Sequence, residues 1–323
     1  MILIPLSLKT CEPQAITTEN QVLLKEAIWI DLLFPSKEEE AQVEQCLDLN
    51  IPTRDEMVEI ELSSRLYKEN DILFMTATMI AQSDSPDSKL DPVTFILTDY
   101  QLITIRYIEP QAFKIVASRL KKFDKTHNNA TSLLLELLDA AIDRLADTLE
   151  LVGRRLDEFS KIIFRPPHRT TVKPDYQQII QQIGVNGDLN TKARESLVTF
   201  DRLITFFGKI AGLRIDQESQ VRLATLSKDI ASLSDHTNFL STKINLLLDG
   251  TLGMVSIEQN NIIKLFSVAA VIFLPPTLVA SIYGMNFHFM PELSWKYGYL
   301  VSIGLMGLVA WLPYKYFKYR KWL

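Results

Sequence analysis

The chain has 323 residues and a formal net charge of −5; 47% of its residues are hydrophobic and 23% are charged. These averages suit a folded protein of about two domains. They exclude a strongly basic chain that binds nucleic acid through its charge, so we expect no nucleic-acid partner.

The N-terminus, MILIPLSLKTCEP, does not resemble a signal peptide. It lacks a basic first region, and Pro5 interrupts an apolar stretch that is already too short. We therefore expect the first ~260 residues to remain in the cytoplasm. Cys11 and Cys46 are the only cysteines and have no metal-type spacing, which fits a reducing compartment without a disulfide.

Residues 1–125 are predicted to form a mixed α/β cytoplasmic domain. Strands are indicated by stretches rich in β-branched and aromatic residues: AIWIDLLF, RLYKENDILFMTATMI, PVTFILTD and QLITIRYI. KEND, QSDSPDS and TDYQ are typical of turns. PSKEEEAQVEQCLDL predicts a short helix after Pro35, in which the acidic run 38–40 indicates a solvated helix start rather than a metal site.

Residues 126–215 are predicted to be a helical part of the cytoplasmic region. Within 130–165, one apolar stripe recurs at three- and four-residue steps: Leu134, Leu138, Ile142, Leu145, Leu149, Val152, Leu156 and Phe159. FRPPHRT ends this helix, because proline removes a donor; His168 is expected to be a loop residue. A second helix follows, is interrupted near IGVNGD, and continues through LVTFDRLITFFGKI.

Residues 216–264 are predicted to be a stalk helix. An apolar seam repeats by three and four, with one polar member: Leu223, Leu226, Ile230, Leu233, Thr237, Leu240, Ile244 and Leu247. No proline occurs between Asp216 and Pro275, so one helix is expected to run directly into the membrane. A helix of roughly 100 Å at ~1.5 Å per residue needs neighbours along its length, which belong to the same subunit, to other subunits, or to both.

Two uncharged runs, 265–283 and 297–314, are predicted to be membrane spans. Each is long enough to cross a hydrocarbon core of ~30 Å. The alternative, two buried core helices in tandem, would need a large protein to hide them. The segment between them, 284–296, is the external loop, because the tail 315–323 has four cations and no acid, which places the tail in the cytoplasm.

Two spans cannot enclose a pore, so a conduction path requires several chains around an axis. Stepping back along the first span by three and four gives one face: Thr277, Leu274, Ala270, Ser267, Ile263 and Asn260, with Asp249 three turns further back. Polar rings around an apolar constriction suit a hydrated cation. Alternatively, the polar residues mark the water boundary of an ordinary helix. Pro275-Pro276 is either a structural kink or a hinge.

The sequence YGMNF at 283–287, followed by MPEL at 290–293 and a second span ending in KYRKWL, resembles the CorA magnesium transporters. SIEQNNIIKLFSVAAVIFLPPTLVASIYGMNFHFMPEL is similar to the enterobacterial-type branch of that family. AIWIDLLFPSKEE and DRLADTLELV extend a weaker likeness over the whole chain. Gly-Met-Asn in this context is the specific element of the resemblance.

The resemblance implies a funnel-shaped homopentamer in a bacterial inner membrane, with an α+β cytoplasmic domain, a long stalk helix and both termini inside. Gly284, Met285 and Asn286 would form the selectivity filter. The implied pore-lining residues are Thr277, Leu274, Ala270, Phe266, Ile263, Asn260 and Asp249. Regulatory Mg²⁺ sites between cytoplasmic domains use carboxylates in this family; because Thr225 occupies the expected stalk position here, Asp229 and Asp235 are the substitutes.

The expected activity is Mg²⁺ influx, with Co²⁺ and Ni²⁺ also carried, and with Mg²⁺ as both substrate and regulatory ligand. Neutral amides and carbonyls can hold the hexahydrate without removing its water. Glu292 would attract cations outside, and two charges crossing 100 mV supply about 4.6 kcal/mol. No P-loop is present, and we expect neither a cofactor nor an enzymatic activity.

Two other readings remain open at this point. A Zn²⁺-transporting member of the same fold should show His or Cys along the path; the first span has none, and His288 is interpreted as a loop residue. A membrane-anchored coiled-coil signalling or scaffold protein would need neither a polar stripe nor a short motif-bearing loop.

Overall fold

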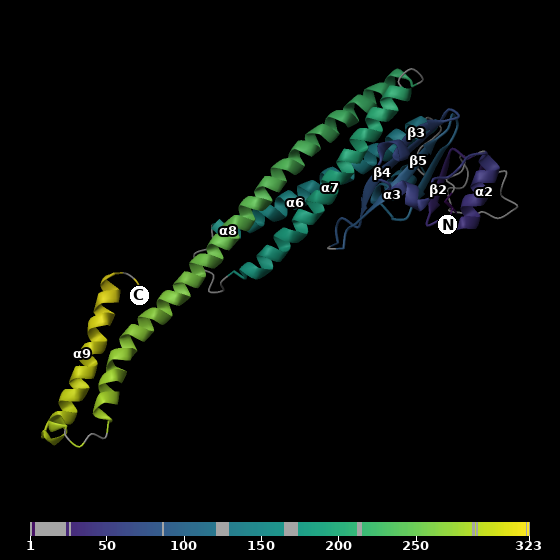
Figure 1. The fold of residues 1–323 in the computed structure, drawn as a ribbon. Coiled ribbons are helices and arrows are strands. Elements are labelled where there is room, and N and C mark those ends of the chain that lie inside the picture. Colours follow the sequence, from purple (N-terminus) through teal and green to yellow (C-terminus); the bar gives the residue numbers. More distant parts are fainter. Residues whose placement is uncertain are drawn as a thin grey trace. The chain divides into compact units, whose positions relative to one another are not determined.

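The computed structural model describes residues 2–3, 24–25, 27–85, 87–120, 129–164, 174–211, 215–285, 288, 290–320 and 322 (Figure 1). Cys11, His168 and Asn286 lie outside these ranges, and the predictions made for them stay predictions. The chain divides into two compact units, Met1–Leu248 and Asp249–Leu323, which are described separately.

The first unit is built on a six-stranded sheet in the order β1-β2-β6-β5-β4-β3. Its strands are β1 (Ile2–Leu3), β2 (Trp29–Leu33), β3 (Leu66–Glu69), β4 (Ile72–Ala81), β5 (Lys89–Leu97) and β6 (Leu102–Arg106). Only the β2–β6 pair is parallel; the other pairs are antiparallel. The four predicted strand regions are confirmed, and the first strand is an addition.

The KEND turn joins β3 to β4 through Asn70 and Asp71, whose φ angles are +47° and +65°. A two-residue hairpin of type I′ needs positive φ at both central positions, and Asn and Asp tolerate it best after glycine. The turn therefore fixes the register of this hairpin, in which Glu69 faces Ile72.

Two short helices, α2 (Lys37–Leu47) and α3 (Arg54–Val58), cover one face of the sheet. A third, α4 (Leu62–Arg65), leads directly into β3. Ser36 and Glu39 form a capping box that starts α2 where it was predicted. Val43 of α2 and Met57 of α3 bury their side chains in a core shared with Ile30 and Ile103 of the sheet.

The opposite face carries α5 (Gln111–Leu120), α6 (Ala130–Phe164) and α7 (Tyr176–Ala211). Phe113 of α5 packs near Trp29 and Phe95, with ring centroids 6.0 and 6.5 Å apart. Helix α7 is tied to β4, because Ser196 Oγ donates to Thr78 O at 2.6 Å. The sheet thus lies between two helical layers (Figure 1).

A buried ion pair fastens the parallel strands β2 and β6 together. Arg106 binds Asp31 through Nε (2.9 Å) and Nη2 (2.6 Å), and both residues are at most 4% exposed. Thr104 donates to the same carboxylate at 2.8 Å, and the Arg106 guanidinium lies 4.4 Å from the Phe113 ring centroid. The charges are therefore fully hydrogen-bonded, which is the condition under which burying them is tolerable.

The predicted break near IGVNGD is wrong, because α7 runs unbroken from Tyr176 to Ala211. Gly184 and Gly187 each cost a helix about 1 kcal/mol relative to alanine. Packing outweighs that cost: a Cβ at Gly187 would lie 3.7 Å from Ile244, so this glycine sits in the contact between α7 and the next helix.

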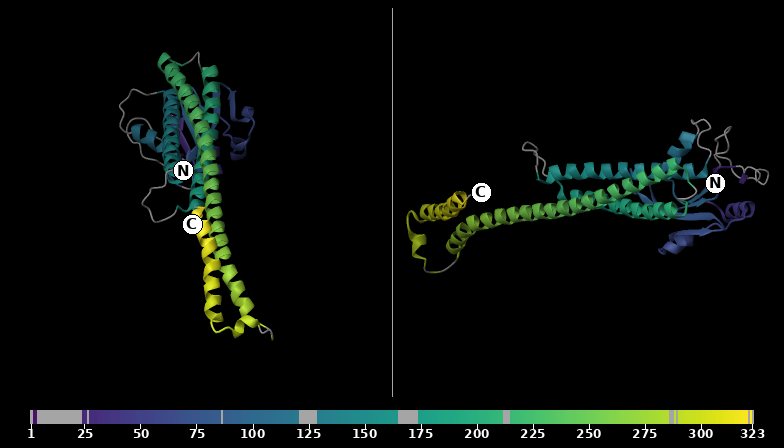
Figure 2. Two further views of the ribbon diagram at one scale, coloured as in Figure 1. Left: turned by 90° about the vertical axis from the view of Figure 1, so that its left-hand side faces the viewer. Right: turned by 90° about the horizontal axis from the view of Figure 1, so that it is seen from above.

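Helix α8 (Gln217–Tyr283) has 67 residues and is continuous through Pro275 and Pro276, which confirms the single long helix. In the second unit it is followed by a 3₁₀ turn, η2 (Pro291–Ser294), and by α9 (Gly298–Tyr319). Figure 2 shows α8 and α9 from two further directions.

We expect Arg106→Leu to lower the free energy of unfolding by about 3–5 kcal/mol, because Asp31 would be left as a buried, unpaired charge. Denaturant unfolding of the full chain, with hydrogen exchange in β2 and β6, measures this loss. The double variant Asp31→Leu/Arg106→Leu removes both charges and should lose markedly less. Equal losses in the two variants would contradict the role given to the charge.

Candidate functional site along helix α8

The inner face of α8 is buried within the first unit. Leu223, Leu226, Ile230, Thr237, Leu240, Ile244 and Leu247 are at most 9% exposed, and Leu233 is half-buried. Leu240 lies 3.7 Å from a Cβ built at Gly153 of α6, and Lys243 pairs with Asp157 of α6 at 2.7 Å. The predicted seam is confirmed, and its partners within the chain are α6 and α7.

A polar contact interrupts this seam. Asn190 of α7 is 2% exposed and donates to Ser241 Oγ at 2.9 Å and to Thr237 O at 3.2 Å. The Oδ1 atoms of Asn190 and of Asn186, one turn away, are buried and have no hydrogen-bond partner in the structure. Such groups are costly unless water reaches them. Because the two hydrogen bonds of Asn190 are directional, they specify the axial position of α8 against α7 more sharply than leucine packing does.

In the second unit α8 is exposed around most of its circumference, and the stripe of predicted pore-lining residues, here termed the uncovered face, lies entirely on exposed positions. They are Asp249, Asn260, Ile263, Phe266, Ala270, Leu274 and Thr277, with Ser267 among them. Ile263, Phe266 and Leu274 are 61–68% exposed. An apolar face this exposed needs a lipid or protein partner.

The uncovered face also extends into the first unit, where the sequence reasoning assigned nothing. Phe239 and Leu246 are about 60% exposed and precede Asn260 at seven-residue steps through Gly253. This seven-residue spacing forms a second heptad, offset from the buried seam, and it could have predicted the exposed apolar positions from the sequence.

Prolines 275 and 276 have no N–H for the carbonyls of Val271 and Ile272, yet the helix continues past them. Directly after the prolines, Thr277 Oγ1 donates to Phe273 O at 2.8 Å. Free carbonyls in a membrane span must be satisfied or face water.

The described part of the Gly-Met-Asn segment, Gly284 and Met285, turns back onto the end of α8. Gly284 N donates to Ala280 O (3.0 Å) and Met285 N donates to Ile282 O (3.2 Å). Glu292 stands in η2, where its carbonyl leaves no room for a side chain at Gly298: a Cβ there would lie 2.6 Å away. Glycine is therefore required where α9 begins.

Asp229 and Asp235 are exposed on α8. Within the described residues, no group of three or more His, Cys, Asp or Glu side chains is arranged to hold a metal ion. Asp229 does influence Asp143 of α6. Burial first, and then the carboxylates of Asp139, Asp147 and Asp229, raise the pKa of Asp143, while Arg119 opposes them.

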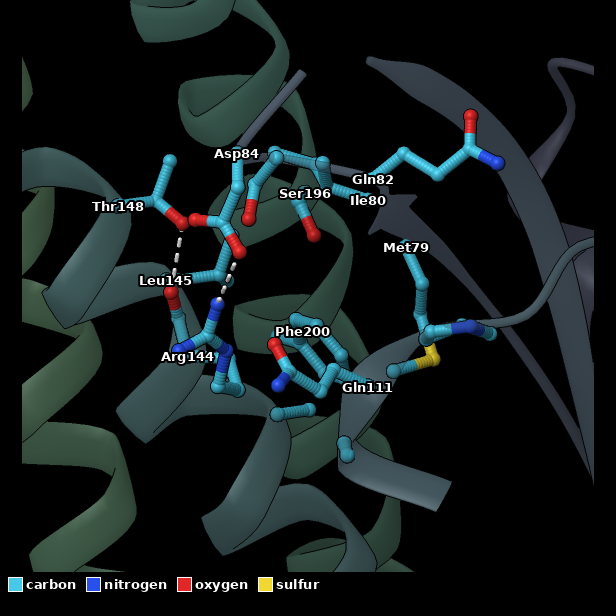
Figure 3. Close-up of a pocket in the computed structure, with 14 residues that line it drawn as sticks. Met79, Ile80, Gln82, Asp84, Gln111, Arg144, Leu145, Thr148, Ser196 and Phe200 are labelled. Atoms are coloured by element: carbon cyan, nitrogen blue, oxygen red, sulfur yellow. Dashed lines mark hydrogen bonds and ion pairs between the residues drawn. The ribbon is translucent and has the colours of Figure 1, made fainter. Parts of the chain in front are cut away.

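A cavity of about 50 Å³ lies among β4, α5, α6 and α7 (Figure 3). Some of its polar side chains bind protein partners: Arg144 pairs with Asp84 (3.6 Å) and Asp147 (3.1 Å), and Thr148 Oγ1 donates to Arg144 O. At ~10–15 Å³ for one water, it has room for a few water molecules. We assign no ligand to it.

The helices α8 and α9 are long and apolar enough to cross a membrane. In their most apolar windows, 6% and 0% of the residues are buried, whereas a core helix of a soluble protein would be mostly buried. An α+β domain continued by such a pair of helices, with an uncovered polar stripe on the first, defines a class of membrane protein with a helical hairpin at its C-terminal end.

The comparisons with known proteins place the chain within this class. Residues 25–320 match the family described as CorA-like Mg²⁺ transporter protein. The chain is 37% identical over 300 residues to the magnesium transport protein CorA of Pasteurella multocida, covering 93% of each chain. It is 36% identical over 305 residues to that of Escherichia coli K12, covering 94% of each. The chain belongs to the CorA family.

Solved structures agree on the fold. The complete CorA magnesium transporter of Methanocaldococcus jannaschii superposes with a TM-score of 0.71 at 17% identity, covering 92% of both chains. The full-length CmaX protein gives 0.66 at 15% identity, covering 91% of this chain and 88% of the other. At these identities the likeness concerns architecture alone.

We expect Asp143→Asn to stabilise the protein slightly at pH 7. Because the pKa of Asp143 is raised in the folded state, the charged form is penalised above that pKa, and the penalty disappears as the pH falls below the ordinary value of an aspartate. The gain should stay under about 1 kcal/mol, since solvent screens a partly exposed charge.

Thermal unfolding of the full chain at pH 7 and pH 3 measures this effect. Glu150→Gln is the matched control, because it loses an ion pair with Arg154 on the same helix and should give no gain. A stabilisation by Asp143→Asn that persisted at pH 3 would refute the electrostatic cause.

Proposed function

We propose that this protein carries Mg²⁺ across a membrane through a path lined by the uncovered face of α8. The observation that carries the proposal is the unbroken 67-residue helix, whose exposed face bears small, polar and apolar residues in the order that a hydrated cation requires. The relatives named as magnesium transport proteins support it, because they match over nine-tenths of the chain.

The assembly that we propose is a homopentamer. A single α8 cannot enclose a path, and closed rings are the usual arrangement of identical subunits. In the ring, the buried seam of α8 would serve its own subunit while the exposed stripe faces the axis. Polar rings of Asp249 and Asn260 on one side, and of Thr277 on the other, would then flank a constriction formed by Ile263, Phe266 and Leu274.

Selection of Mg²⁺ would occur at Gly284, Met285 and Asn286. Mg²⁺ loses its water reluctantly, so a ring of amide and carbonyl oxygens can hold the hydrated ion by its outward hydrogens. A ring of fixed charges would release the ion too slowly for conduction. Glu292 would concentrate cations at this mouth. Co²⁺ and Ni²⁺, which have similar hydrated forms, would share the path.

The orientation follows from the tail. By the positive-inside rule, the cations Lys315, Lys318 and Arg320 would keep the end of α9 on the cytoplasmic side. With two spans, the α+β domain would lie on that same side of a bacterial inner membrane. The membrane potential would then drive influx, at about 4.6 kcal/mol for two charges across 100 mV.

Gating would depend on intracellular Mg²⁺. Asp229 and Asp235 lie on exposed positions of α8 and would share the ion with a neighbouring subunit, holding the ring symmetric and the constriction closed. Loss of the ion would leave carboxylates facing one another, and their repulsion would loosen the stalks.

Asn286→Ala is expected to abolish Mg²⁺ uptake by proteoliposomes, because it removes the amide ring at the mouth. The oligomer, followed by size-exclusion chromatography with light scattering, should remain intact. Asn261→Ala is the control, since Asn261 is an exposed amide of α8 off the stripe, and it should transport normally. Full uptake by Asn286→Ala would refute the assignment.

Raising Mg²⁺ inside the proteoliposomes should reduce influx, and Asp229→Asn/Asp235→Asn should weaken this inhibition by roughly tenfold or more in Mg²⁺ concentration. Comparison of Mg²⁺, Co²⁺, Ni²⁺ and Zn²⁺ as permeant ions separates this function from Zn²⁺ transport. Flux that is indifferent to internal Mg²⁺ in the unmodified protein would eliminate the gating scheme but not the transport itself.

A further inference from the structure

The end of α9 carries three cations, each placed over an aromatic ring four residues earlier. Lys315 Nζ lies 4.8 Å from the Trp311 ring centroid, and Lys318 Nζ lies 5.9 Å from that of Tyr314. The Arg320 guanidinium lies 6.0 Å from the ring of Tyr316. Contacts within about 6 Å of a ring face attract a cation, so these charges are held close to the helix.

Two of the pairs share one side of the helix. Lys315 and Lys318 are three residues apart, as are Trp311 and Tyr314, and such residues are neighbours on a helix surface. Arg320 follows Lys315 by five residues and therefore points roughly 140° away. Lys315 and Lys318 thus form a two-cation face with an aromatic base, and all four side chains are exposed.

No carboxylate of the described chain neutralises this face. Neither lysine has an ion pair among the described residues, and the sequence has no Asp or Glu after Glu292. The opposite end of α9 differs: there a single cation, Lys296, lies 6.0 Å from the Tyr297 ring and is followed by uncharged residues. Two adjacent cations without an acid call for an anionic partner.

The position on the helix identifies the source of that anion. Lys315 is the first charged residue after the uncharged run 297–314, and Trp and Tyr rings settle at the headgroup level of a membrane. A group held here therefore meets lipid phosphates. A phosphatidylethanolamine headgroup brings its own ammonium toward the lysines, whereas a phosphatidylglycerol headgroup brings only the negative phosphodiester.

We propose that Lys315 and Lys318, resting on Trp311 and Tyr314, form a binding site for the phosphodiester of an anionic phospholipid of the phosphatidylglycerol type. The site rests on the proposed function insofar as α9 must span a membrane. It does not require that the protein conduct ions.

The test counts lipids bound by the intact protein. Purified full-length protein in detergent is titrated with phosphatidylglycerol or phosphatidylethanolamine, and native mass spectrometry gives the bound lipid per subunit. The unmodified protein should prefer phosphatidylglycerol. Lys315→Gln/Lys318→Gln should bind it about 30-fold more weakly, since each basic residue near an anionic surface contributes about fivefold.

Two variants serve as controls. Lys315→Arg/Lys318→Arg keeps both charges over their rings and should retain the affinity. Lys296→Gln removes one cation from the other end of the same helix and should change it little. Circular dichroism establishes that each variant is folded.

Three results would overturn the site: equal binding of the two lipids, unchanged binding by the Gln/Gln variant, or displacement of the lipid by equimolar inorganic phosphate, which would reveal a phosphate site without lipid recognition. Because binding is counted without flux, a protein that prefers phosphatidylglycerol but carries no Mg²⁺ would refute the proposed function alone.

Discussion

Helix α8 must present one side to the core formed with α6 and α7 and another side that this core does not cover. Most features of the chain follow from that constraint. One side closes the core of α6 and α7 with leucine and isoleucine. The other side alternates apolar side chains with Asp249, Asn260 and Thr277, which are exposed in the part of the chain that the structure describes. Two heptads, offset around the helix, allow both because residues three and four apart share a face. If α8 were rotated so that the two sides exchanged places, Asp249 would enter a hydrophobic core and the leucine seam would face water.

The α+β domain provides a rigid surface on which α8 packs. Its sheet is held at the parallel β2–β6 junction by Asp31 and Arg106, and α7 is fastened to β4 through Ser196. Helix α8 then packs on α6 and α7. These contacts connect the sheet to the stalk helix within one unit. A structural change in the α+β domain can therefore be transmitted through α7 to α8, which carries the proposed path.

The sequence predicted the parts of this structure that depend on local periodicity. The seam from Leu223 to Leu247 and the unbroken α8 needed only spacing and the absence of proline, and the Asn70–Asp71 turn needed only residues that tolerate positive φ. The break predicted in α7 was wrong because this helix packs, at Gly187, against Ile244 of α8, a residue far along the chain. The pairing of Asp31 with Arg106 spans 75 residues and has no local signature. A site shared between subunits, as proposed for Asp229 and Asp235, depends on geometry that one chain's periodicity does not contain.

The contact of Asn190 with Thr237 and Ser241 has a mechanical consequence. Leucine seams look alike from one turn to the next, so a long helix packed by them alone could slip lengthwise by ~5.4 Å at little cost. Here such a slip would separate Asn190 from both acceptors and strand another buried amide beside the two unpartnered Oδ1 atoms. Helix α8 is therefore held in one axial register against α7. It can tilt or bend at this contact but cannot slide along its own length.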